Sequence, residues 1–163
     1  QILSGGEHLK YVYRLDGRAA VFAGYDAARL YLAIRCEDDH PVFAGPIDQR
    51  DHLVLKFDAD LAGDFGPGAD EPDLTLTVVP EGDAVRVTGA EGVQAAMTRE
   101  ERAYFIELSV PLRLVRKGPV RPGEAIGFDL VWADADPEGG DIVVSRLRWA
   151  GGSRTMGQLF FGP

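Results

Sequence analysis

The sequence contains very little cysteine, the residue that forms disulfides and thiolate metal sites. Its 163 residues include one cysteine, Cys36, which excludes an internal disulfide and a zinc site built from several thiolates. No apolar run is long enough to cross a bilayer. Lys and Arg number 17 against 26 Asp and Glu, and the net charge of −9 would repel a phosphate backbone or an anionic membrane. These absences argue against nucleic-acid partners and against membrane insertion by this domain.

Helical periodicity is also nearly absent, and alternation of apolar with polar residues takes its place. This alternation predicts half-buried strands over residues 30–34, 53–57, 74–78, 85–87, 104–110 and 126–132. Turn-forming clusters such as "PEGD" and "DPEGGD" separate the strands. The pattern indicates an all-β protein, an antiparallel β-sandwich of jelly-roll type. Its one helix candidate is the short segment 111–117, "PLRLVRK", with Pro first and Gly118 as a stop.

The length suits one domain spanning residues 1–163, with a single sizeable core. Trp132 falls in phase with Phe128 and Leu130, so we expect its side chain in that core. We expect Cys36 there too, because a free cysteine behaves as a small apolar residue. We also expect the domain to be one part of a larger protein.

Three segments, in this order, resemble the family 9 carbohydrate-binding modules and the wider group of DOMON-like sandwiches. They are "YDAARLYLAIRCEDD" (25–39), "DHLVLKFDAD" (51–60) and "YFIELSVPL" (104–112), followed by "GFDLVWADAD" (127–136) and a closing "MGQLFF" (156–161). The resemblance covers most of the chain. It implies a sandwich that binds an oligosaccharide or polysaccharide without catalysis, as an accessory module of a secreted, periplasmic or cell-surface protein.

In that family the sugar lies between two tryptophans, and polar side chains surround it. Trp149 is similar to the second of these, with Arg146 and Arg148 beside it. No tryptophan stands in "GPIDQRD", where the first is expected, and Val54 stands at the position of the family's glutamate. The resemblance therefore implies a site made of the aromatic residues Trp149 and Phe43 with the polar residues Arg146, Arg148, Gln49 and Arg50.

The residues around Trp149 leave two interpretations open. Trp149 is in phase with Leu147, which favours a place in the core. The glycines at 151 and 152 favour a turn, where a side chain can leave the sheet and reach a ligand.

Two carboxylates, Glu107 and Asp129, each alternate with apolar residues on their strands, so both are expected on one side of a sheet. Such a pair can act as the acid and base of glycoside hydrolysis, can accept hydrogen bonds from sugar hydroxyls, or can pair with arginines such as Arg35 and Arg86. The last of these is the most common arrangement.

Two acidic stretches can offer oxygen ligands to a hard cation such as calcium. The first supplies Asp58, Asp60, Asp64, Asp70 and Asp73, and the second supplies Asp134, Asp136, Glu138 and Asp141. The resemblance adds weight to a structural Ca²⁺, for which Asp58, Asp60, Asp64 and Asp70 are our predicted ligands.

Two alternatives to sugar binding remain. A structural or protein-interaction sandwich could keep the fold without the sugar site, as the missing tryptophan and Val54 suggest. A noncovalent haem, as in some DOMON-like domains, would need Met97 or Met156 with His8, His40 or His52, and no histidine motif supports it.

Overall fold

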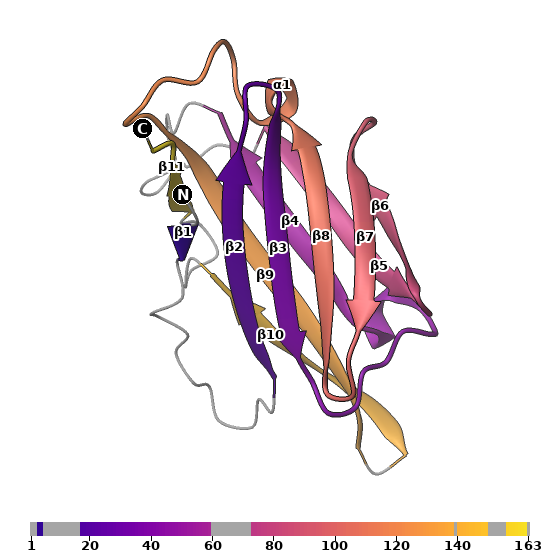
Figure 1. Ribbon diagram of the computed structural model, residues 1–163. Coiled ribbons are helices and arrows are strands. Elements are labelled where there is room, and N and C mark those ends of the chain that lie inside the picture. The colour runs from indigo at the N-terminus through magenta and orange to yellow at the C-terminus, as the bar shows by residue number, and fades with distance from the viewer. Residues whose placement is uncertain (1–2, 5–16, 60–72, 139, 150–155, 163) are drawn as a thin grey trace.

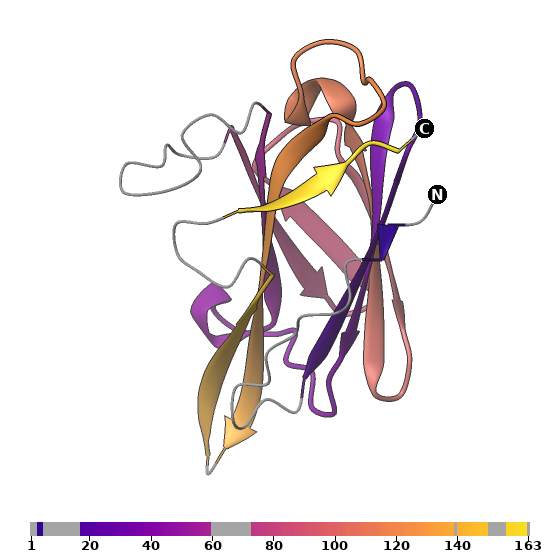
Figure 2. The same cartoon turned by 90° about the vertical axis from the view of Figure 1, so that its left-hand side faces the viewer.

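A computed structural model of the chain describes residues 3–4, 17–59, 73–138, 140–149 and 156–162. Over these residues the strands form two sheets that face each other, which Figure 2 shows edge-on. The strand pairs within both sheets are antiparallel. The expected all-β sandwich is therefore confirmed.

The five-stranded sheet faces the viewer in Figure 1. Its strands lie in the order β1 (Leu3–Ser4), β2 (Arg18–Tyr25), β3 (Arg29–Glu37), β8 (Ala103–Pro111) and β7 (Gln94–Arg99). The central strands β3 and β8 are far apart in the sequence and pair along their whole length, with Leu32 opposite Leu108. This sheet therefore depends on contacts between distant parts of the chain.

The six-stranded sheet lies behind it. Its path is β10 (Asp141–Arg148), β9 (Ala125–Glu138), β4 (His52–Asp58), β5 (Leu74–Glu81) and β6 (Ala84–Thr88), and β11 (Gly157–Phe160) also pairs with β9. Because β9 has 14 residues, β11 pairs with its first part and β10 with its second part, while β4 pairs along the middle of the strand.

The core lies between the sheets and consists of the alternate side chains that the sequence pattern selects. It includes Leu32, Ile34, Leu53, Leu55, Leu76, Val78, Ile106, Leu108, Phe128 and Leu130. Trp132 is 0% exposed and packs edge to face on Tyr104, with 6.3 Å between ring centroids. Cys36 is buried as a free thiol. The predictions for Trp132 and Cys36 are both confirmed.

All six predicted strands are present, as β3, β4, β5, β6, β8 and β9. Strands β1, β2 and β7 were not predicted. Strand β10 ends directly before Trp149, where the phase with Leu147 indicated a strand, and β11 lies within the closing segment "MGQLFF". The predicted helix over 111–117 is shorter than expected, a four-residue turn α1 (Leu112–Val115), and a 3₁₀ turn η1 (Ile47–Gln49) precedes β4. None of the helices in the described ranges is long and apolar enough to cross a membrane.

Candidate functional site

Trp149 directly follows β10, at the junction between β10 and β11 along the edge of β9. Its backbone N–H donates to the Leu130 carbonyl at 2.8 Å, and its half-buried indole packs edge to face on Phe128 at 6.1 Å between centroids. The indole also lies against Gly157 of β11, where an added Cβ would be 2.7 Å from Nε1. The side chain is therefore held in the sandwich edge, with part of its surface in solvent.

The two arginines predicted beside Trp149 differ in their surroundings. Arg148 is half-buried, and its Nε lies 3.0 Å from a carboxylate oxygen of the buried Asp129. Arg146 is exposed on the same face of β10. Arg146 is thus the more exposed of the two arginines.

The other predicted sugar-binding residues divide between two places. Gln49 ends η1 and Arg50 follows it, and because η1 contacts β10 the structure brings this segment to the side of the sandwich that carries Arg146. Phe43 packs instead on Tyr104 at 5.1 Å, with the Arg99 guanidinium 4.8 Å from its ring centroid. Phe43 and Trp149 therefore have different ring neighbours, and the structure does not bring them together as two walls of one site.

Glu107 and Asp129 do not share a sheet face, contrary to the prediction. Glu107 is exposed on β8 of the five-stranded sheet, whereas Asp129 is buried on β9 of the six-stranded sheet. Alternation places a side chain relative to its own strand and says nothing about which sheet the strand joins. Asp129 pairs with Arg148 and not with the expected Arg35 or Arg86.

A groove of about 530 Å³ lies on the outer face of the five-stranded sheet, the face turned to the viewer in Figure 1. Two rows of cross-strand neighbours line it. One row is Phe22, Ala33, Glu107 and Ala96, and the next is Gly24, Tyr31, Ser109 and Gln94. Four of these eight residues are Gly, Ala or Ser. Because their side chains are short, they leave a depression between the larger aromatic and polar side chains on either side. Its volume is in the range of small-molecule sites.

The aromatic wall of the groove is formed by Phe22 and Tyr31, each 41% exposed. The Tyr31 hydroxyl donates to Asp26 Oδ2 at 2.8 Å. The other Asp26 oxygen accepts from the N–H groups of Ala28 at 2.7 Å and Arg29 at 2.8 Å, which fixes the β2–β3 turn. The backbone donors lower the pKa of Asp26, and its carboxylate raises the pKa of Tyr31 by accepting the phenolic proton in a hydrogen bond. The tyrosine ring is therefore held in one orientation.

The opposite part of the groove is polar. Gln94, Glu107 and Ser109 present an amide, a carboxylate and a hydroxyl within it. Arg29 fixes this end, because its guanidinium bonds the hydroxyl and the carbonyl of Ser109 and also the Gly92 carbonyl at 3.0 Å. A rigid aromatic wall and several hydrogen-bonding groups thus face one apolar floor.

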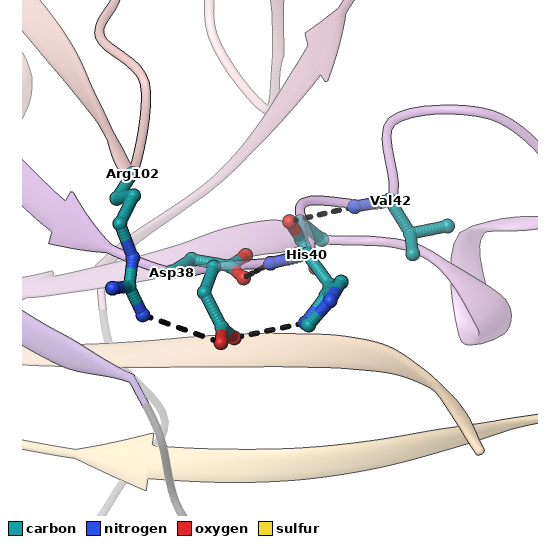
Figure 3. Close-up of polar contacts among 6 residues, drawn as sticks. Asp38, His40, Val42 and Arg102 are labelled. Carbon is teal, nitrogen blue, oxygen red and sulfur yellow. Dashed lines mark hydrogen bonds and ion pairs between the residues drawn. The ribbon is translucent and has the colours of Figure 1, made fainter.

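A cluster of carboxylates lies at the other end of β3, between the sheets. Asp38, Asp134 and Asp136 can place one oxygen each within 4.8 Å of one another, the spacing that one cation needs. The adjoining β3–β4 loop is tied by hydrogen bonds from the His40 N–H to Asp38 and from the Val42 N–H to Asp51, and the Arg102 guanidinium lies 3.3 Å from Asp39 (Figure 3). Asp39, His40 and Asp136 form a second such group among the described residues, and the two groups share Asp136.

Burial favours the protonated form of the aspartates in and beside this cluster. Asp51 is fully buried and accepts from the Ala135 N–H at 2.8 Å. Desolvation raises the pKa of Asp51 to about 9, and the nearby charge of Asp38 adds to the shift. Desolvation also raises the pKa of Asp136. Of the predicted calcium ligands, Asp58 is buried at the end of β4, and Asp60, Asp64 and Asp70 lie outside the described residues, so that site stays a prediction.

Solved structures with a similar fold come from carbohydrate-binding proteins. A family 9 carbohydrate-binding module from Caldicellulosiruptor kristjanssonii in complex with cellotriose aligns over 99% of this chain and 83% of that one, with a TM-score of 0.74 and 13% identity. This chain has the family 9 module fold. The same kind of module in complex with glucose aligns over 91% and 79% of the two chains, with a TM-score of 0.70 and 15% identity. A putative carbohydrate-binding protein from Bacteroides uniformis aligns over 99% and 86%, with a TM-score of 0.55 and 11% identity.

No family model and no curated protein sequence matches the chain. The likeness is therefore one of structure, and it confirms the fold that the resemblance implied.

The sequence did not reveal the groove because two of its four strands were not predicted. Tyr31 and Glu107 lie at positions that alternate with apolar residues on predicted strands. This alternation was the feature of the sequence that could have indicated that both side chains face solvent. The pairing of β3 with β8, and the addition of β2 and β7, brought them into one surface.

Proposed function

We propose that this protein binds carbohydrate without catalysis, in the groove on the outer face of the five-stranded sheet. The observation that carries the proposal is the exposed Tyr31 ring, held by Asp26 at the side of a groove that also contains Glu107, Gln94 and Ser109. The cellotriose and glucose complexes of the similar modules support the ligand class.

The physical reasoning starts from the two kinds of surface on a sugar ring. Its C–H face is apolar and packs on an aromatic ring, and its hydroxyls need hydrogen-bond partners in return for lost water. Phe22 and Tyr31 offer the aromatic surface, and the polar groups opposite offer donors and acceptors. Because Tyr31 is already held in place, little side-chain freedom is lost when a sugar binds.

The arrangement of carboxylates favours binding over hydrolysis. Glycoside hydrolysis uses two carboxyl groups on either side of the scissile bond. Among the described residues, Glu107 is the one carboxylate that lines the groove. Asp129 belongs to the other sheet and pairs with Arg148. In keeping with this role we assign the domain as an accessory module of a secreted, periplasmic or cell-surface protein.

The β10–β11 junction is the second candidate location. This location is favoured by the partial exposure of Trp149. The same side of the sandwich also carries the other predicted polar residues, Arg146, Arg148, Gln49 and Arg50. The packing of Trp149 on Phe128 and against Gly157 favours a structural role for its ring instead.

Calorimetric titration with cellotriose and other neutral oligosaccharides tests the proposal. We expect Tyr31→Ala to weaken binding about tenfold or more, because stacking area and a fixed wall are lost together. Phe160→Ala is the matched control, since Phe160 is exposed on β11 outside the groove, and it should bind as the unmodified protein does.

Two variants assign the location. Arg146→Ala and Trp149→Ala should leave the affinity unchanged if the groove holds the sugar, whereas loss in these two with retention in Tyr31→Ala would move the site to the β10–β11 junction. Absence of binding to a broad panel would refute glycan recognition and leave a structural or protein-interaction sandwich.

A further inference from the structure

Among the described residues that line the groove, Glu107 is the one ionisable carboxylate, and it belongs to the polar part opposite the aromatic wall. Its cross-strand neighbours are Ala33 on β3 and Ala96 on β7, neither of which can neutralise it. The other described residues that line the groove are uncharged. The carboxylate is exposed to solvent, so water and not protein now satisfies it.

The nearest arginines on this sheet face are held by other partners. Arg35 lies in the next row of the sheet and forms an ion pair with Glu37, approaches Glu100 at 4.0 Å and lies over the Phe105 ring at 5.5 Å. Arg29 bonds Ser109 and Gly92 at the other end. Within the described part of the chain, no cation lies within ion-pair distance of Glu107.

We propose that the ligand of this groove is an oligosaccharide with free amino groups, whose ammonium pairs with Glu107 while its rings pack on Tyr31 and Phe22. This assignment rests on the proposed function and names the class of sugar. The bound sugar would cover Glu107 and remove its water, and a charge-assisted hydrogen bond from an ammonium compensates a carboxylate better than a hydroxyl does.

Two further features fit a cationic ligand. The faces of Phe22 and Tyr31 attract a cation through the ring quadrupole, so the aromatic wall also favours an ammonium over a neutral group. The net charge of −9 draws cationic chains toward the protein and repels acidic ones. Sugars that carry carboxylates or sulfates would instead place a negative charge beside Glu107.

The test compares three oligosaccharides of equal length by calorimetry at a mildly acidic pH, at which the amines of the first are protonated: glucosamine, N-acetylglucosamine and glucose oligomers. The N-acetyl form keeps the ring and removes the charge. We expect the unmodified protein to bind the free-amine oligomer about fivefold or more tightly than either neutral oligomer, with a preference that shrinks as salt rises.

Glu107→Gln keeps the size and hydrogen-bonding capacity of the side chain and removes its charge. It should abolish the preference for the free amine while the neutral oligomers still bind. Glu101→Gln is the matched control: Glu101 is exposed in the β7–β8 turn outside the groove, and the same change of charge there should leave the preference intact.

The outcomes separate this assignment from the proposed function. Equal binding of all three oligomers, lost in Tyr31→Ala, would overturn the amino-sugar assignment and keep glycan binding in the groove. Free-amine binding that survives Tyr31→Ala, or that falls equally in Glu101→Gln, would reflect general attraction to an acidic protein and would also overturn it. Failure of every oligomer would refute the proposed function itself.

Discussion

At the scale of single residues, the groove depends on small side chains as much as on aromatic ones. Gly24 lies on its floor next to Tyr31, and a Cβ built there meets no atom within 4 Å. The position is the last but one of β2 and is paired with Tyr31, and at a paired strand position Gly is less favourable than a residue with a side chain. The glycine thus keeps the groove open at some expense of strand stability.

This reasoning predicts the effect of Gly24→Val. The new side chain should project into the groove and weaken sugar binding, while the free energy of unfolding rises by about 0.5–1 kcal/mol because a β-branched residue replaces Gly in a strand. Urea denaturation and calorimetry on the same sample measure both effects. Undiminished sugar binding in a stable variant would show that the ligand does not occupy this part of the groove.

At the scale of elements, the β2–β3 turn helps to set the orientation of the aromatic wall of the groove. Asp26 accepts hydrogen bonds from the turn N–H groups of Ala28 and Arg29 and from the hydroxyl of Tyr31. One carboxylate therefore sets both the turn and the orientation of the aromatic wall.

The Asp26→Ala variant should weaken sugar binding about two- to tenfold, because Tyr31 must then lose rotational freedom on binding. The pKa of Tyr31 should fall back toward its ordinary value, since the carboxylate that accepts its proton is gone. Spectrophotometric titration of the phenol reports the pKa, and calorimetry reports the affinity. Tyr31→Phe should add little to Asp26→Ala, since both changes remove one hydrogen bond; fully additive effects would contradict the coupling.

The elements also explain how far the sequence could predict the structure. Strands such as β3 and β8 alternate clearly because one face is in the core and the other in solvent. By contrast, β2 and β7 contain several alanines, which fit either face, so neither strand has a distinct pattern. The pairing of β3 with β8 and the separation of Glu107 from Asp129 depend on long-range assembly, which local alternation does not encode.

At the scale of the whole molecule, the acidic character of the chain extends into the space between the sheets. Asp38, Asp51 and Asp134 are all buried at one end of the sandwich. Desolvation and the neighbouring carboxylates raise the pKa of Asp51 to about 9, against 3.8 for an ordinary aspartate, which favours the protonated form of this side chain in the fold at neutral pH. An unfolded chain would expose the same residue to water and ionise it.

This difference gives a pH dependence of stability with a definite sign. Between pH about 4 and about 9 the folded protein holds a proton on Asp51 that the unfolded chain has released, so the contribution of Asp51 is greatest at the acid end and is lost as pH rises. The free energy of unfolding should fall toward pH 9 by at most about 1.4 kcal/mol per pH unit from this group.

Chemical denaturation at several pH values, with a chelator present so that no cation neutralises the cluster, measures this dependence. Asp51→Asn keeps an oxygen for the Ala135 N–H and has no proton to lose, so its stability should vary less with pH than that of the unmodified protein. Asp83→Asn, on a side chain that is 95% exposed, should leave the slope unchanged. Parallel curves for Asp51→Asn and the unmodified protein would mean that the buried carboxylate is ionised in both states. In that case the charges of the neighbouring acidic residues would be compensated by other groups, so that Asp51 can stay ionised in the folded protein.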